Sequence, residues 1–116
     1  MEPEKRKSIR LKKALDLQYL SEGEGEHQVW VAGLLRDISE TGLNFSSDKS
    51  FSVHEVIRLR IRFPFNPFQW IELKGRCVGI KGLSIGIYFI RLEFEDLQKE
   101  QKKAIREYFA WALNKN

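Results

Sequence analysis

The clearest pattern in the chain is a strict alternation of apolar and charged residues over Val56–Phe63. The apolar positions are Ile57, Leu59, Ile61 and Phe63, and the charged positions between them are Arg58, Arg60 and Arg62. Successive side chains of a β-strand point to opposite faces, so this spacing predicts a strand with one buried and one exposed face. We expect the three arginines to form the solvated face, with a partner surface as the alternative.

Shorter segments of similar character flank this strand and predict a domain made mostly of β-structure. The expected strands are Ala14–Leu20, Gln28–Leu35, Leu43–Phe45, Gln69–Ile80 and a last strand that runs to about Phe94. Segments rich in Gly, Ser, Asp and Pro separate them: Ser21–Glu26, Asp37–Gly42, Ser46–Ser52, Pro64–Pro67 and Gly82–Gly86. Six or seven short strands joined by such turns predict a small antiparallel β-barrel.

The C-terminal part of the chain changes to a helical period. Apolar positions recur at three- and four-residue spacing from Glu95 to about Leu113, which predicts a helix. Glu95 and Asp96 would suit the positive end of its dipole. We expect this helix to cover one open end or edge of the barrel.

Length and composition fit one ordinary globular domain. The chain has 116 residues, of which 42% are hydrophobic and 31% charged. Its single cysteine, Cys77, excludes an internal disulfide, fits a reducing compartment and is expected to serve packing. No apolar run is long enough to span a membrane, and residues 1–7 do not resemble a secretory signal.

The positive charge is concentrated at the N-terminus. Residues 1–13 hold six cations and two anions, which accounts for the whole net charge of +4, while the rest of the chain is neutral. A broad nucleic-acid-binding face is therefore not favoured by charge alone. We predict that residues 1–13 form a flexible basic arm, which serves either a small local anion site or only solubility.

Two short motifs carry the candidate chemistry. Arg6 and Arg10 lie four residues apart in the arm, and Asp37, Ser39 and Gly42 lie on the predicted turn. Guanidinium groups suit phosphates and the O6/N7 edge of guanine, whereas a carboxylate can accept from the N–H groups of guanine's other edge. The alternative is that the second motif only pins a turn through side-chain to backbone bonds.

Together the motifs resemble the signature of the PilZ family, R-x-x-x-R followed by [D/N]-x-S-x-x-G, at Arg6, Arg10, Asp37, Ser39 and Gly42. G-I-Y-F at Gly86–Phe89 and the terminal helix add to the likeness. The resemblance implies a six- to seven-stranded β-barrel over residues 14–116 that binds cyclic di-GMP. It implies that the two arginines close over the ligand from the arm and that the turn receives it.

Three further residues are candidates for lesser roles at the site. Lys5 and Lys7 lie beside Arg6 and would add positive charge or a direct contact. By the resemblance Gly86 would lie near the ligand, and the alternative is that it lets strands pack closely. In addition, the loop from Pro64 to Trp70 could be an edge of the core or a contact surface.

The expected function is that of a bacterial, cytoplasmic receptor that orders its arm on binding cyclic di-GMP and signals to an unidentified partner protein. No catalytic motif or metal-ligand spacing is present, so we expect neither an enzyme nor a cofactor. Two alternatives remain at this point. One is a PilZ-type adaptor that binds no nucleotide, and the other is a small-barrel nucleic-acid binder that uses the arm and the three arginines.

Overall fold

The computed structural model describes residues 15–22 and 28–114. The predicted arm, residues 1–13, lies outside the described residues, and so do its four candidate site residues Lys5, Arg6, Lys7 and Arg10.

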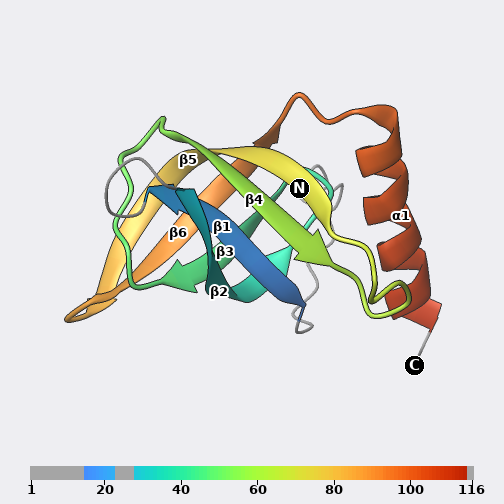
Figure 1. Ribbon diagram of the computed structural model, residues 1–116, viewed down its shortest axis with the longest axis horizontal. Helices are drawn as coiled ribbons and strands as arrows, with labels where there is room; N and C mark the ends of the chain where they lie inside the picture. Colours follow the sequence, from blue (N-terminus) through green and yellow to red (C-terminus); the bar gives the residue numbers. More distant parts are fainter. Residues whose placement is uncertain (1–14, 23–27, 115–116) are drawn as a thin grey trace, which may run out of the picture.

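Six strands and one helix make up the described part of the chain. They are β1 (Asp16–Glu22), β2 (Gln28–Ile38), β3 (Gly42–Ser47), β4 (Val56–Arg62), β5 (Ile71–Ser84), β6 (Ile87–Glu95) and α1 (Lys99–Asn114). Every strand pairs antiparallel with its neighbours in the order β1-β2-β3-β6-β5-β4, and β1 pairs with β4 to close the barrel (Figure 1). The predicted small antiparallel barrel is therefore confirmed, with six strands.

The core of the barrel consists of the inward-pointing side chains, which come from alternating positions along the strands. Ile57, Leu59 and Ile61 of β4 are each at most 3% exposed. Tyr19 and Phe45 contribute rings whose centroids lie 5.7 Å apart. The alternation that predicted β4 thus correctly separated its inward and outward faces.

The outward-pointing arginines of β4 are less exposed than the sequence predicted. Arg58 is exposed, but Arg60 and Arg62 are partly covered. The reason is Trp70, which precedes β5 and places its ring 4.5 Å from each of the two guanidinium carbons.

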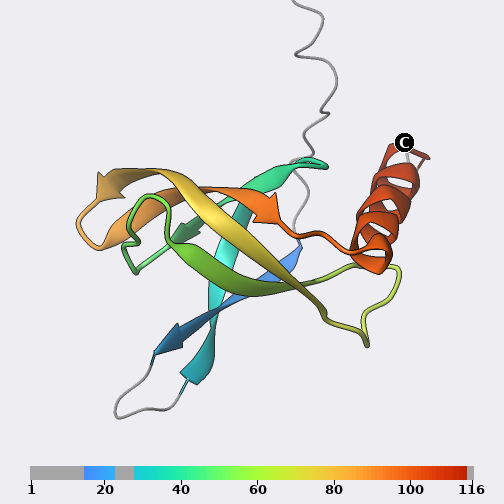
Figure 2. The same ribbon diagram turned by 90° about the horizontal axis from the view of Figure 1, so that it is seen from above.

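Helix α1 stands at one end of the barrel, beside the ends of β4 and β5 (Figures 1 and 2). Its buried residues are Ile105, Tyr108, Phe109 and Ala112. The ring of Tyr108 stacks on Phe63 at 4.9 Å, and Gln101 donates from Nε2 to the Glu72 carbonyl at 2.6 Å. The helix covers an end of the barrel, as the sequence predicted.

The start of the helix was predicted four residues too early. Glu95 is the last residue of β6, and its carboxylate accepts from Arg76 Nε at 2.7 Å across the sheet. Asp96 has a φ of 53°, which turns the chain away from the barrel before a helix can begin. At the true start, Gln98 donates its N–H to Gln101 Oε1 at 2.6 Å, one half of a capping box.

Different residues of the loop between β4 and β5 take the two roles that the sequence left open. Phe65 stacks on Phe63 at 5.5 Å and lies 5.9 Å from the ring of Trp111 in α1, so it extends the aromatic edge of the core. Phe68, in contrast, is 96% exposed.

Candidate functional site

The turn that joins β2 to β3 is built around Ser39. This residue is fully buried, and its Oγ accepts from the backbone N–H groups of Thr41 and Gly42, each at 3.2 Å. The Ser39 N–H also donates to the Gly42 carbonyl at 2.8 Å. Ser39 therefore fixes the shape of the turn and presents no free surface of its own.

Gly42 is required by close packing of two strands. A Cβ at this position would lie 2.1 Å from the backbone oxygen of Leu92 in β6. The reason for a glycine here is this close approach of backbone and not a positive φ. Gly42 lets β3 lie against β6 directly beside the turn.

Asp37 lies on β2 rather than on the turn, because β2 continues to Ile38. The register between β2 and β3 shifts between Leu35 and Asp37, which places Asp37 opposite Asn44. Asn44 donates from Nδ2 to Asp37 Oδ1 at 2.9 Å. A bulge of this kind re-aims a side chain, here holding the carboxylate over the outer face of β3.

The carboxylate belongs to a row of polar side chains that crosses three strands. Asp37 of β2 pairs with Asn44 of β3, and Asn44 pairs with Arg91 of β6. Arg91 is exposed, and no acceptor for its guanidinium lies among the described residues. We call Asp37, Asn44 and Arg91 the polar row. A shallow cavity of about 300 Å³ lined in part by Thr41, Gly42 and Arg91 adjoins it.

Two buried atoms of β3 lack hydrogen-bond partners among the described residues. They are Asn44 Oδ1, on a residue that is 4% exposed, and Ser46 Oγ, on a residue that is 9% exposed. Beside Ser46, the guanidinium of Arg36 lies 5.8 Å from the centre of the Phe89 ring. The outer face of β2, β3 and β6 thus combines a carboxylate, an amide, a hydroxyl and two guanidiniums.

Sequence reasoning missed Asn44, Ser46 and Arg91. The signal for the first two was present: in Leu43–Ser46 apolar and polar residues alternate, so the polar ones must share the outer face with Asp37. Arg91 had no such local signal, because it joins the row only through the pairing of β3 with β6.

Gly86 lies apart from the polar row, at the tip of the hairpin between β5 and β6. Its φ of 76° accounts for the glycine, and an added Cβ would meet nothing within 4 Å. Close strand packing is therefore the wrong explanation for Gly86. Its role toward a ligand stays a prediction.

The point at which the N-terminal segment joins the barrel lies near the polar row. Asp16, the first residue of β1, pairs with Leu34, three residues before Asp37 on β2. This separation is about 10 Å along the strand. Arg6 and Arg10 precede this point in the sequence but lie outside the described residues.

The chain resembles known proteins in both sequence and fold. The family model of the PilZ domain matches residues 4–111. The chain belongs to the PilZ domain family. This PilZ match includes the segment that carries Arg6 and Arg10, and it covers the barrel and most of α1. No match was found among curated protein sequences.

Solved structures share the PilZ fold. The inhibitor of motility MotI (DgrA) of Bacillus subtilis is 24% identical, with a TM-score of 0.72 over 96% of this chain and 53% of that one. YcgR of Escherichia coli, solved in complex with c-di-GMP, is 10% identical with a TM-score of 0.68 over 95% and 46%. The PilZ domain of YcgR with c-di-GMP, also 10% identical, has a TM-score of 0.64 over 90% and 89%.

The chain thus spans about half the length of MotI and of full-length YcgR. At these identities the likeness establishes the fold. In the described part of the chain, no helix is long and apolar enough to cross a membrane. Within the same residues, no group of three His, Cys, Asp or Glu side chains is placed to hold a metal ion.

Proposed function

We propose that this PilZ domain is a receptor for cyclic di-GMP (c-di-GMP), which binds on the outer face of β2, β3 and β6 under the N-terminal arm. The observation that carries the proposal is the polar row of Asp37, Asn44 and Arg91, assembled from three strands beside the point where the arm joins the barrel. The intact signature of the family and the ligand in the YcgR complexes support it.

The chemistry of the row suits one guanine and one phosphate. A carboxylate is a suitable acceptor for guanine N1–H and N2–H, and the bond from Asn44 Nδ2 orients the carboxylate of Asp37. Adenine does not offer that pair of donors. The Arg91 guanidinium can form a bidentate pair with a phosphate or with the O6/N7 edge of guanine.

The arm would supply the second half of the site. Arg10 precedes Asp16 by six residues, which span about 20 Å when extended. That reach exceeds the distance of about 10 Å along β2 from Leu34, the partner of Asp16, to Asp37. Arg6, four residues further on, could then contact a different part of the same ligand, with Lys5 and Lys7 adding positive charge.

Binding would order the arm on the barrel, a disorder-to-order switch that a partner protein could read. In this account the domain is a receptor and adaptor rather than an enzyme, and it acts in the cytoplasm. Ser39 and Gly42 shape the turn and position Asp37 instead of contacting the ligand.

Calorimetric titration of four variants tests these roles. A charge-assisted bond contributes about 1.5–3 kcal/mol, so Arg6→Ala and Arg10→Ala should each weaken binding of c-di-GMP about ten- to a hundred-fold. Asp37→Ala should weaken it by a similar factor, because it removes the acceptor for guanine N1–H and N2–H. Arg58→Ala removes an exposed arginine of β4, a strand outside the polar row, and is the matched control. Unchanged affinity in the three site variants would refute the assignment.

A nucleotide-free adaptor is the second candidate, and one observation favours it. Ser39 is accounted for by the turn and Gly42 by the close approach of β6, so these two signature residues by themselves do not demand a ligand. This candidate predicts no heat with c-di-GMP and retention of a partner protein in the absence of nucleotide.

A further inference from the structure

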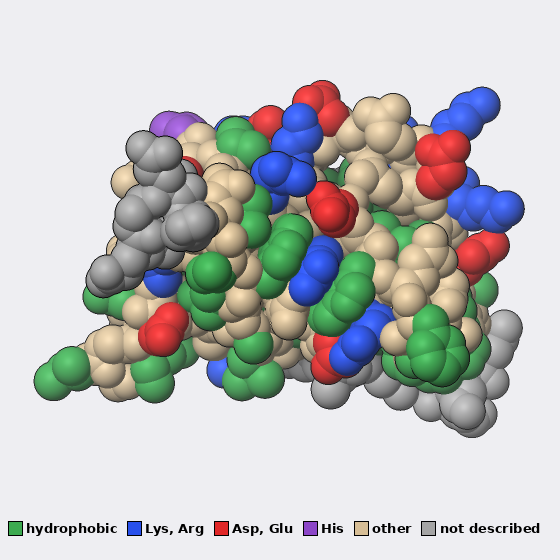
Figure 3. Space-filling model, in the orientation of Figure 1, with side chains coloured by type: hydrophobic (Ala, Val, Ile, Leu, Met, Phe, Trp, Pro, Cys, Tyr) green, Lys and Arg blue, Asp and Glu red, His purple; other side chains and the backbone are tan. Residues whose placement is uncertain are grey.

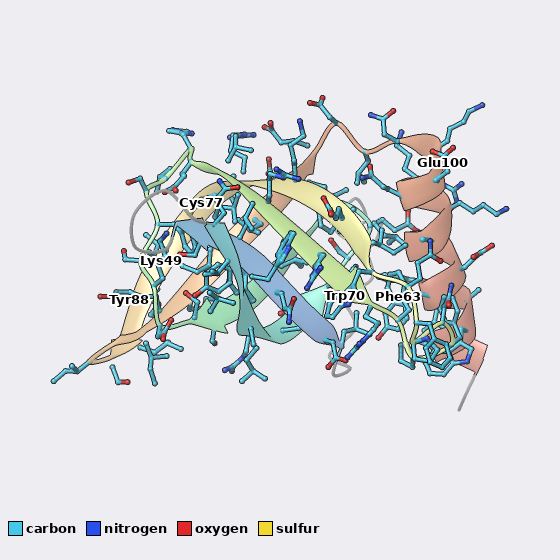
Figure 4. All side chains as sticks on the ribbon, viewed as in Figure 1. Lys49, Phe63, Trp70, Cys77, Tyr88 and Glu100 are labelled. Atoms are coloured by element: carbon cyan, nitrogen blue, oxygen red, sulfur yellow. The ribbon has the colours of Figure 1, made fainter. Side chains whose placement is uncertain are left out.

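A second row of side chains, in which indole and guanidinium groups alternate, crosses the outer face of the barrel from β2 to β4. Arg60 of β4 has its guanidinium carbon 4.4 Å from the ring centre of Trp30 in β2 and 4.5 Å from that of Trp70. Arg62 lies 4.5 Å from the same Trp70 ring. We call Trp30, Arg60, Trp70 and Arg62 the Trp–Arg strip. Figure 3 shows hydrophobic and basic side chains alternating across the middle of this face, and Figure 4 marks Trp70 there.

Arg60 is the member of the strip without a counter-ion. Its neighbours are neutralised: Arg58 pairs with Glu72 at 3.1 Å, and Arg62 donates from Nε to Asp16 at 3.0 Å. Arg60 instead donates from Nε to the amide oxygen of Gln18 at 2.8 Å. Among the described residues no acceptor faces its two terminal nitrogens, although Glu72 is its partner in the strand register.

The guanidinium of Arg60 is therefore held in place before any ligand arrives. Two rings and one hydrogen bond fix its plane, and its outer edge keeps four N–H donors. This arrangement suits bidentate pairing with a planar carboxylate, since the orientation is already set.

Apolar surface adjoins this edge. Leu34 of β2 is 63% exposed. It borders a groove of about 380 Å³ together with Ala32, Asp16, Arg62 and Trp70. Trp and Arg are the residues most often found at the centres of protein interfaces, where an apolar contact and a desolvated charge pair occur together.

We propose that the Trp–Arg strip is a docking surface for an acidic segment of a partner protein. One Asp or Glu of the partner pairs with the outer edge of Arg60, and an aliphatic or aromatic side chain next to it enters the groove beside Leu34. A nucleic acid fits less well, because a row of phosphates needs several cations without counter-ions, whereas Arg58 and Arg62 are already paired with Glu72 and Asp16. The strip lies on β2, on β4 and on Trp70 just before β5, so the proposal does not depend on nucleotide binding at the polar row.

The test uses the full chain without nucleotide and a phage-displayed library of random peptides. Selection on the wild-type chain should recover peptides with Asp or Glu beside Leu, Ile or Phe. Their affinity, measured by fluorescence anisotropy, should fall about ten- to a hundred-fold in Arg60→Gln. Arg60→Lys should not restore it, because an ammonium keeps the charge but loses the fork and the stacking. Arg106→Gln is the control variant and should bind normally.

Leu34→Glu separates recognition from folding. It changes an exposed position outside the Trp–Arg contacts, so the fold should persist while the added carboxylate repels the acidic peptide. Recovery of no peptide, recovery of peptides without acidic residues, or wild-type affinity in Arg60→Gln and Leu34→Glu would overturn the proposal. So would tight binding of an oligo-dT strand that Arg60→Gln abolishes, which would make the strip a nucleic-acid surface.

Discussion

Replacement of Gly42 by alanine gives the sharpest test of how the site is built. The added Cβ would lie 2.1 Å from the Leu92 carbonyl oxygen, about 0.9 Å closer than the 3.0 Å that real contacts respect. The added Cβ would also lie 3.2 Å from the Glu93 Cα. Both neighbours are backbone atoms, so rotation of a side chain cannot relieve the clash. β3 and β6 must therefore separate at this end of their ladder.

The expected cost follows from two effects. Overpacking of a closely packed site costs about 1–3 kcal/mol. Strand separation also weakens adjacent backbone bonds, such as Phe94 N–H to the Thr41 carbonyl at 2.9 Å, at about 1 kcal/mol each. We expect Gly42→Ala to lower the free energy of unfolding by about 2–4 kcal/mol. Each kcal/mol should lower Tm by roughly 3–6 °C in a domain of this size.

The assay is urea unfolding followed by tryptophan fluorescence, with Gly82→Ala as the control. Gly82 lies in β5, and an added Cβ there meets nothing within 4 Å. Its replacement should leave stability unchanged or raise it by about 0.4–1 kcal/mol, because the unfolded chain loses freedom. Equal stability of the two variants would show that the β3–β6 approach does not explain Gly42.

Three further predictions concern buried groups. Ser39→Ala removes the acceptor for two turn N–H groups and should cost about 1–3 kcal/mol in urea unfolding, and a wild-type midpoint would contradict the role of Ser39 in the turn. Burial raises the pKa of Tyr19, with Asp48 adding to the effect, and burial alone raises the pKa of Tyr108. The fold favours the protonated form of both tyrosines. Their contribution to the free energy of unfolding should therefore be fully present below about pH 10 and should be lost as the pH rises through their folded pKa values. The loss should be smaller in Tyr108→Phe. Cys77 is fully buried and its pKa is raised by desolvation, so Ellman's reagent should modify it only at the rate at which the chain opens, and rapid labelling of the native protein would show otherwise.

The fold was predictable from the sequence wherever a local period decides it. The alternation through Val56–Phe63 identified β4 and its inward face, and the spacing of apolar residues identified α1. The boundaries were less predictable because distant pairs set them. β2 runs on to Ile38 because it pairs with β3, and β6 keeps Glu95 because Arg76 of β5 binds it.

The same distinction applies to the candidate site. Ser39 and Gly42 predicted a turn, and the bonds that Ser39 Oγ accepts from Thr41 and Gly42 explain Ser39 within that turn. The need for glycine at position 42 comes from Leu92 on β6, which is distant in sequence. Arg91 and the stacking of Trp30 on Arg60 depend on strands that are distant in sequence, so no local pattern contains them. The regular spacing of the arginines in β4 predicted which way they point, but not that Trp70 would cover two of them.

The central claim is that this PilZ domain binds a guanine dinucleotide at the polar row. Calorimetric titration of the purified chain with c-di-GMP, and separately with cyclic di-AMP, tests it most directly. The account predicts saturable heat with c-di-GMP and much weaker binding of the adenine analogue, which lacks the N1–H and N2–H donors that Asp37 accepts. Absence of heat with c-di-GMP, or equal affinity for the two nucleotides, would contradict it.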